Sequence, residues 1–533
     1  MLAILFGIEK NGGMAIGKPK RQVRFEDPVG LLGERLVGVY RLLAEHGDVL
    51  FPEDYFADLF KRSRKGRPTI PARVMATVMV LQALEGLSDQ EAVDRLGCDL
   101  RWQAAAGVHV GFEPFHPTVL VGMRNRLRAS ARPKRLLEDV VGVARESGAM
   151  SGRARVVDST PIFDAVATQD TVTQLRAAIR KVLMVLRPEL AARARAVIER
   201  DDDYSSPGKP PCDWDDPAAK EALIDALVRD AVAVLDALDG FDLTDAEQDA
   251  VDVLAVVAGQ DVELDDDGVF RIFRGTAKDR LISTVDTEAR HGHKSRSRRF
   301  DGYKGHVSVD PDGEIIEDVA VTPANAHDQD ALDDLLDPHA GDDDKPIVFA
   351  DCAYGSGRTR ADMATGGFDL RAKVPPVPRR DGRFSKDEFR IDLDAGIVSC
   401  PAGHTAPIGF RADGSGIASF DTHCDPCPLR GRCTTNKAGR TVTIHEHERL
   451  LQDAKTAQAD PDWQADYRAT RPKVERKIAH LMARVHGGRK ARTRGAARVL
   501  TDLVARAAAV NLVRLDNLGV AHTGGAWQQR AGP

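Results

Sequence analysis

The sequence predicts a mixed α/β protein in which helical segments flank and interrupt a core of short strands. Residues 31–60 and 70–147 repeat apolar side chains at helical spacing. Shorter β-prone segments bounded by turn residues occur at 153–158, 302–310, 314–321, 346–350 and 368–374. A chain of 533 residues, 42% hydrophobic and 29% charged, is too long for one ordinary core, so two to four domains are expected.

The N-terminal helical region contains a short turn between two predicted helices. Val74 and Leu81 belong to the first helix, and Ser88 followed by Glu91 forms a capping box that begins the second. The segments 71–84 and 88–96 therefore have a helix-turn-helix layout. This layout is found in DNA-binding domains and also in helices that are simply packed together, and the sequence leaves both interpretations open.

Two insertions interrupt the core. Residues 170–200 and 217–260 are helical and rich in Ala, Leu and Val, which predicts a helical insertion at about 164–262. A cysteine-rich insertion spans 376–445. Two late helices are predicted after it, at about 462–486 and 493–515.

Without the insertions, the elements follow in the order of three strands, a helix, a strand, a helix, a strand and a final helix. Three antiparallel strands followed by βαβ units give a mixed sheet with helices on its faces. That is the order of an RNase H-like core. The predicted division is a tail (1–30), a helical N-terminal DNA-binding domain (31–150), the first part of a catalytic core (151–375), the cysteine-rich insertion (376–445), the C-terminal core helices (446–515) and a second tail (516–533).

The charge is unevenly distributed. Residues 201–270 contain 21 acidic and 3 basic residues, a net of −18, so the remainder of this chain of net charge −6 carries +12. Basic residues gather at 61–73, at 124–135, in the loop at 290–299 and at 461–514. Such patches suit a phosphate backbone, although each one alone is also compatible with a solvated helix face or loop.

Three carboxylates have the placement that phosphodiester chemistry requires. Asp158 is predicted to end the first strand, Asp351 follows the fourth, and Glu475 lies in the first late helix. Carboxylates from separate elements can hold two Mg²⁺ ions roughly 4 Å apart, which activate one oxygen and stabilise the leaving one. The alternatives are an Asx turn at Asp158 and helical ion pairs at Glu475.

Four of the seven cysteines fall in one short stretch. They are Cys400, Cys424, Cys427 and Cys433. Four thiolates with a C-x2-C element predict a structural zinc site, with reduced free cysteines as the alternative.

At this point the sequence resembles the bacterial insertion-sequence transposases of the DDE type, which have an RNase H-like catalytic core. The matching segments are Val156–Thr160, Phe300–His306, Thr322–Asp328, Ala350–Gly355 and Arg471–Glu475. The resemblance implies that Asp158, Asp351 and Glu475 form a triad for two Mg²⁺ or Mn²⁺ ions. The sequence departs from the family pattern at two positions: Arg471 follows Tyr467 by four residues instead of three, and Met482 stands where the family has a lysine.

The resemblance also implies double-stranded DNA as the partner. Tyr467 and Arg471 would position DNA near the triad, and Arg471 shares a helix face with Glu475. Further contacts are expected from Lys473, Lys294, Lys304, Arg64 and Arg67.

The implied activity is binding of terminal inverted repeats, metal-dependent cleavage and strand transfer into target DNA by a homodimer or larger synaptic complex. The rivals are a catalytically inactive DNA-binding derivative and a stand-alone RNase H-like nuclease. No apolar run reaches the ~18–20 residues of a membrane helix, and Met1–Ile8 lacks the features of a signal peptide, so a cytoplasmic, nucleoid-associated protein is expected.

Overall fold

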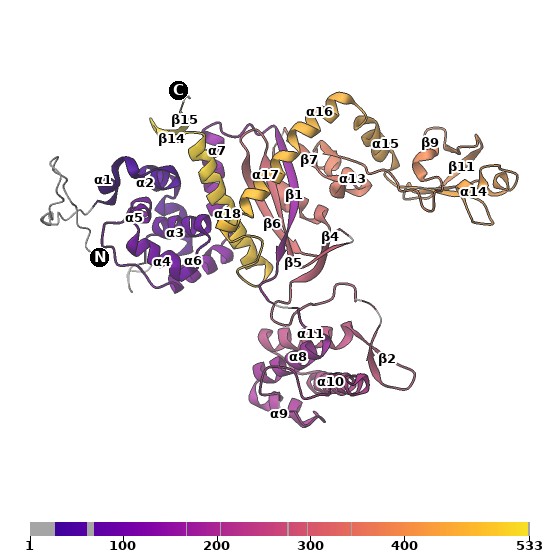
Figure 1. Cartoon of the computed structure of the whole chain (residues 1–533), viewed down its shortest axis with the longest axis horizontal. Helices are drawn as coiled ribbons and strands as arrows, with labels where there is room; N and C mark the ends of the chain where they lie inside the picture. The colour runs from indigo at the N-terminus through magenta and orange to yellow at the C-terminus, as the bar shows by residue number, and fades with distance from the viewer. Residues whose placement is uncertain are drawn as a thin grey trace, which may run out of the picture.

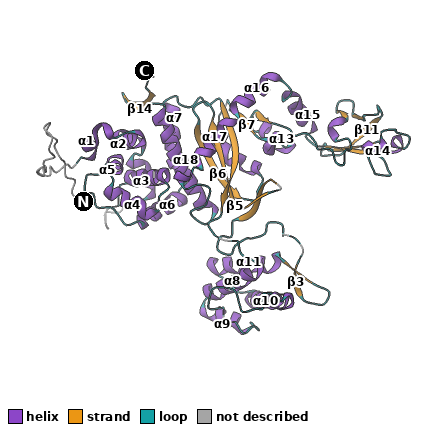
Figure 2. Ribbon diagram, in the orientation of Figure 1, coloured by secondary structure: helices purple, strands orange, loops and turns teal. Residues whose placement is uncertain are grey.

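The computed structural model describes residues 27–530 except 61–68, 167, 203, 274, 276, 296, 340 and 343. The fold is mixed α/β: a central sheet carries helices on both faces, an N-terminal helical region lies beside it, and two further modules project from it (Figures 1 and 2). No helix in these described ranges combines the length and apolar character needed to cross a bilayer. Lys294 is among the described residues, whereas Arg64 and Arg67 lie outside them.

The central sheet has six strands of mixed direction. Their bounds are β1 Ala154–Phe163, β4 Arg290–Ser295, β5 Arg298–Asp310, β6 Ile315–Pro323, β7 Ile347–Ala350 and β8 Leu370–Ala372. β1 is antiparallel to β5 on one side and parallel to β7 on the other, and β7 is parallel to β8. β4 and β6 both pair antiparallel with β5. The predicted mixed sheet, with antiparallel strands first and parallel strands later, is therefore confirmed.

One prediction about the first strand is wrong. β1 does not end at Asp158 but continues to Phe163, paired throughout with β5. On its other side β1 pairs with β7 only as far as Val156. Beyond Val156 this edge next pairs at Phe163, with Lys490, so among the described residues Pro161 has no strand partner on it and can lie in the strand despite its missing N–H.

Helices cover both faces of the sheet (Figure 1). Successive residues of β1 point to opposite faces, so Val156 belongs to the large core with α7, α17 and α18, while Val157 belongs to a smaller core with α12 and α13. The bounds of these helices are α7 Arg135–Glu146, α12 Leu332–Leu336, α13 Gly357–Thr365, α17 Pro472–Leu481 and α18 Ala496–Asn517.

The N-terminal helical region shares the large core with one face of the sheet. Its helices are α1 Pro28–Leu32, α2 Gly38–Leu50, α3 Ala72–Glu85, α4 Asp89–Cys98, α5 Leu100–Ala106 and α6 Thr118–Ala129. The predicted capping box at Ser88 and Glu91 is present. α3 is buried along most of its length, and the exposed side of α4 includes Glu91, Asp94 and Arg95, so it carries both signs of charge.

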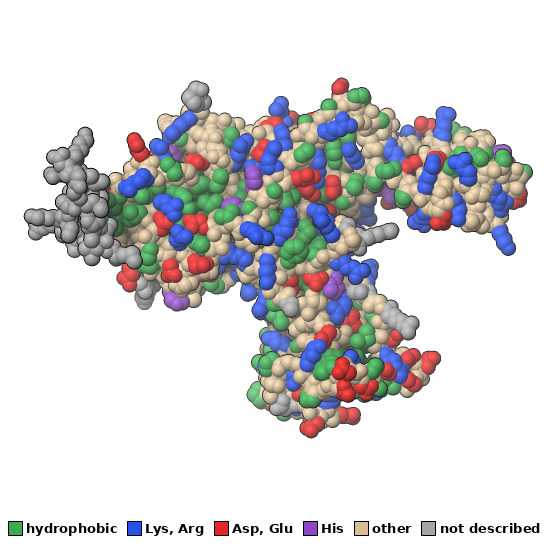
Figure 3. Space-filling view, in the orientation of Figure 1, with side chains coloured by type: hydrophobic (Ala, Val, Ile, Leu, Met, Phe, Trp, Pro, Cys, Tyr) green, Lys and Arg blue, Asp and Glu red, His purple; other side chains and the backbone are tan. Residues whose placement is uncertain are grey.

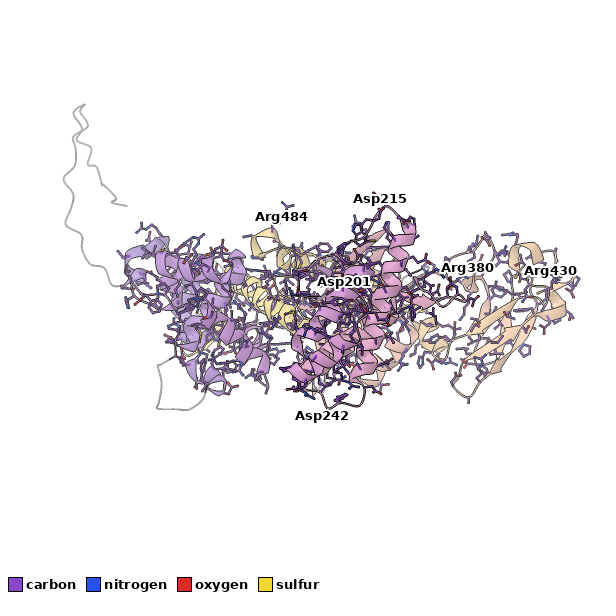
Figure 4. The ribbon with its side chains drawn as sticks, turned by 90° about the horizontal axis from the view of Figure 1, so that it is seen from below. Asp201, Asp215, Asp242, Arg380, Arg430 and Arg484 are labelled. Carbon is purple, nitrogen blue, oxygen red and sulfur yellow. The ribbon has the colours of Figure 1, made fainter. Side chains whose placement is uncertain are left out.

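The acidic insertion has a core of its own, which includes Leu175, Leu227 and Leu254. It comprises α8 Thr171–Val185, α9 Pro188–Ala196, α10 Pro217–Leu238, α11 Asp245–Gln260, β2 Val262–Leu264 and β3 Phe270–Ile272. The core extends past residue 262 to Leu281. Asp215 and Asp242 lie at opposite edges of this module (Figure 4).

The cysteine-rich segment forms an arm with an antiparallel five-stranded sheet, which the sequence did not predict. Its elements are β9 Arg390–Asp392, β10 Ile397–Ser399, β11 Thr405–Phe410, β12 Gly416–Ser419, α14 Arg430–Cys433 and β13 Thr441–Ile444. Val398, Phe420 and Ile444 belong to its separate core. α15 (Glu448–Ala457) leads back to the central sheet, and Arg380 and Arg430 mark the arm in Figure 4.

The C-terminal part differs from the prediction in two places. The helix expected over 462–486 is broken, because Pro472 cannot donate to the preceding turn and instead begins α17 after α16 (Pro461–Thr470). Residues beyond 516, expected as a tail, form a hairpin of β14 (Val520–Thr523) and β15 (Ala526–Gln529). Trp527 is buried there, and its backbone N–H donates to Glu146 Oε1 at 3.0 Å.

A buried charge network connects β1, β5 and β6 beneath the sheet surface. The guanidinium of Arg155 donates to Glu317 Oε1 at 2.8 Å and to Asp310 Oδ2 at 3.2 Å. His339 Nε2 lies 2.8 Å from the other oxygen of Glu317. Burial opposes ionisation of Glu317, but hydrogen bonds from His339 and Arg155 hold its pKa well below the ordinary value.

Replacing Arg155 with methionine is expected to lower the free energy of unfolding by about 3–5 kcal/mol, because Asp310 and Glu317 would lose their buried counter-charge. Chemical denaturation of the full chain measures this change. Arg153→Met is the matched control: its side chain is 81% exposed and pairs only at the surface with Asp312, so a change within about 0.5 kcal/mol is expected. Equal effects of the two substitutions would contradict the assigned role of Arg155.

Candidate active site

Asp158 lies in the middle of β1, on the sheet face that α17 covers. Its Oδ2 is 2.9 Å from Arg471 Nη2, and its Oδ1 accepts the backbone N–H of Ser159 at 2.8 Å. Burial raises the pKa of Asp158, while the opposing effect of Arg471 only partly offsets the shift. A buried carboxyl group with one cationic neighbour can be stabilised further by additional positive charge.

Asp351 directly follows β7 and lies beside Asp158. Val156 pairs with Phe349 in the parallel ladder, so two residues further along both strands the two aspartates are neighbours on the same face. Asp351 Oδ1 accepts the N–H of Ala353 at 2.8 Å, which caps the short 3-10 helix Cys352–Tyr354. This hydrogen bond at the end of β7 thus fixes the orientation of the Asp351 side chain.

Glu475 lies in the first turn of α17 but points toward solvent. Its side chain is 67% exposed, and its Oε1 is 3.6 Å from Arg471 Nη1. Within the described residues, no three Asp, Glu, His or Cys side chains are close enough together to enclose a metal ion. The structure therefore brings Asp158 and Asp351 together, and it connects Glu475 to them only through Arg471.

Arg471 is the cation at the centre of this cluster. It lies at the break between α16 and α17, and its side chain is only 10% exposed. Burial lowers its pKa, but Asp158 and Asp351 more than compensate, so the net shift is upward. Its Nε and Nη1 are buried without a hydrogen-bond partner among the described residues. The site that contains Asp158 and Asp351 therefore also contains two N–H groups of Arg471 that have no hydrogen-bond acceptor among the described residues.

Tyr467 connects α16 to the end of β7. Its hydroxyl donates to the carbonyl oxygen of Ala350 at 2.9 Å, one residue before Asp351. Its ring stacks on Trp463 with centroids 5.0 Å apart, and Lys373 Nζ lies 4.8 Å from the ring centre. The predicted residue Tyr467 therefore supports the backbone at the site, and sequence reasoning missed Trp463 and Lys373.

The remaining predicted basic residues are placed differently. Lys304 Nζ is bound to Asp328 Oδ1 at 2.7 Å, and Asp328 also accepts from Ser159 Oγ at 2.9 Å. Asp328 begins the short 3-10 helix Asp328–Ala331 and also anchors Ser159, the residue next to Asp158. Lys473 is half-buried on α17, and Lys294 is exposed on β4.

The cysteine cluster lies in the arm, away from the aspartates. All four predicted thiols, from Cys400 to Cys433, line one small cavity, and Cys424 Sγ accepts the N–H of Arg440 at 3.3 Å. Burial raises the pKa of the Cys433 thiol. Among the described residues, no three possible ligands lie close enough together to hold a metal ion, so the structure does not support the zinc prediction.

Comparison with known families gives two matches. Residues 399–516 match a family described as a transposase DDE domain, and residues 37–126 match one described as a transposase domain (DUF772). These matches indicate an insertion-sequence DDE transposase. No curated protein and no solved structure matches the chain.

The two matches lie on different parts of the transposase. The DDE match includes Arg471 and Glu475 together with the cysteine-rich arm, whereas Asp158 and Asp351 lie before it. The N-terminal match runs from α2 into α6. The DDE match supports an enzyme of the nuclease and transposase type, with DNA as its substrate.

Tyr467→Phe is expected to lower the free energy of unfolding by about 1 kcal/mol, because the buried carbonyl of Ala350 loses its donor. Tyr354→Phe provides the control, since the Tyr354 hydroxyl is buried without a hydrogen-bond partner among the described residues. That change should be neutral or stabilising. Denaturant unfolding of both variants measures the difference, and a neutral Tyr467→Phe would show that its hydroxyl does not support the strand end.

Proposed function

We propose that this transposase cuts DNA at the ends of its own element and joins them to target DNA, using Asp158, Asp351 and Glu475 with divalent metal ions. The observation that carries this proposal is the pair of neighbouring aspartates on one face of the sheet, with the buried cation Arg471 against them. The match to a transposase DDE domain supports the same assignment.

The order and direction of the strands support an RNase H-like core. From one edge the sheet runs β6, β5, β1, β7 and β8, and β5 is antiparallel to both of its long neighbours. Asp158 on β1 and Asp351 after β7 occupy adjacent central strands. The proposed division has a helical N-terminal domain, a core interrupted by the acidic and cysteine-rich insertions, and C-terminal core helices.

Asp158 and Asp351 suit Mg²⁺ or Mn²⁺ by the chemistry of their side chains, whereas Glu475 is exposed and is connected to them through Arg471. Carboxylate oxygens are the ligands that these ions prefer, and Asp158 and Asp351 already share one positive partner. Asp158, Asp351 and Glu475 would hold two such ions, which when bound supply activation of an oxygen nucleophile and stabilisation of the leaving oxygen. Arg471, with its free donors, would hold a phosphate oxygen beside the aspartates.

The proposed partners are the terminal inverted repeats and the target DNA. Lys473 on α17 and the exposed Lys294 on β4 would contact the backbone, with Arg64 and Arg67 from the N-terminal basic run. Two ends are processed together, so we propose a homodimer or larger synaptic complex. The second candidate is a DNA-binding protein without catalysis, and the outward position of Glu475 favours it.

Asp158→Ala, Asp351→Ala and Glu475→Ala should each reduce Mg²⁺-dependent cleavage of a labelled element end by roughly 10³-fold, equivalent to about 4 kcal/mol of transition-state stabilisation. Binding of the same DNA should remain, since the carboxylates do not attract phosphate. The control is Asp462→Ala, an exposed acid in the first turn of α16, which should retain wild-type cleavage.

Four outcomes are distinguished by this assay. Loss of cleavage in all three variants supports the proposal. Cleavage that survives in all three contradicts it, and binding without any cleavage by the unaltered protein supports the non-catalytic candidate. Cleavage without joining of strands would indicate a nuclease in place of a transposase.

A further inference from the structure

A groove of about 730 Å³ lies between the N-terminal helical region and the start of α18. One wall comes from α6, α3 and the start of α4, and the other comes from the loop before α18 and its first turns. The basic residues in its lining are Arg124, Arg128, Arg492 and Arg498. They come from two basic runs that are far apart in the sequence.

The groove has more arginines than it has acids to pair with them. Its two acids are Asp89 and Asp502. Asp89 is held by Arg124, and Asp502 lies 2.7 Å from Arg506, which is outside the lining. Three arginines of the lining therefore remain without an acidic partner in the described part of the chain: Arg128, Arg492 and Arg498.

The arginines of the groove repel one another electrostatically. Burial lowers the pKa of Arg128, and the neighbouring charges of Arg498 and Arg124 lower it further. Like charges placed together without counter-ions weaken the folded protein and strengthen its attraction for anions. Arg498 is exposed, so a ligand in the groove can reach it.

The walls of the groove are held together by contacts between distant segments. His486 Nδ1 lies 2.6 Å from the carbonyl oxygen of Leu84, and the guanidinium of Arg492 donates to the carbonyl oxygen of Leu87. α18 also packs against α3 and against the sheet. The groove thus spans the helical region and the body that carries the aspartates, and Figure 3 shows Lys and Arg side chains gathered along this junction.

We propose that this groove binds the phosphate backbone of duplex DNA. The inference rests on the proposed function, because it takes DNA as the substrate. Forked arginine donors suit phosphate oxygens, and a strip of arginines with few acids suits a polyanion better than a protein surface of mixed charge. Arg124 and Arg128 of the groove lie on α6, so α6 is the helix of the N-terminal region that would face the DNA.

The test measures the salt dependence of binding to a mixed-sequence duplex of about 30 base pairs, roughly three helical turns. The variant is Arg128→Ala combined with Arg498→Ala in the full chain. Loss of two phosphate contacts should reduce the slope of log affinity against log salt by about 1.8, and should weaken binding about tenfold or more at roughly 0.1 M salt. Arg128→Lys with Arg498→Lys should keep the wild-type slope, because the charge is retained.

A control removes the same charge elsewhere. Arg195→Ala with Arg229→Ala changes two exposed arginines of the acidic insertion and should leave the slope unaltered. The thermal midpoint of the groove variant should equal or exceed that of the wild type, since like charges are separated. Metal-dependent cleavage should be unchanged in the Arg195→Ala, Arg229→Ala control.

The outcomes separate the groove from the proposed function. If the wild type binds and cuts DNA while the groove variant keeps the full salt slope, the groove assignment is overturned and the proposed function stands. If the wild type neither binds nor cuts duplex DNA, both fail. A flatter slope in the groove variant, with the wild-type slope kept by the control variant, supports the groove.

Discussion

The arrangement of the site depends on the contact between Arg471 and Asp158. Two aspartates on adjacent strands, with Asp158 largely buried, repel each other and resist desolvation, and a buried guanidinium is what stabilises them in the folded chain. Arg471 can reach Asp158 because Pro472 breaks the late helix and begins α17 over this face of the sheet. The same contact brings Glu475 to the rim of the site through its partner arginine.

The chain folds around this cluster into a central body with one large continuous core. Two further modules have separate cores. The N-terminal helices, α18 and one face of the sheet share apolar packing, so the groove between them is part of the same body as the aspartates. The acidic insertion and the cysteine-rich arm pack separately and project from the sheet. A DNA segment in the groove would therefore be held by the body that carries the candidate catalytic residues.

Much of the fold followed from local patterns. The strand ending before Asp351, the hairpin of β5 and β6 and the capping box at Ser88 all arise from residues close together in the sequence. The extension of β1 past Asp158 was missed, because pairing with β5 overrides the turn preference of Ser159 to Pro161. The arm sheet was missed because its strands are only three to six residues long. The proximity of Arg128 to Arg498 depends on tertiary packing, which no local pattern encodes.

Direct measurement of Mn²⁺ binding by electron paramagnetic resonance tests the central claim, that Asp158 and Asp351 hold a divalent metal ion beside Arg471. At neutral pH the wild-type chain should bind Mn²⁺, Asp158→Asn and Asp351→Asn should bind it more weakly, and Arg471→Met should bind it more tightly because a competing positive charge is removed. Binding that is unchanged in both aspartate variants, or weaker in Arg471→Met, would contradict the account.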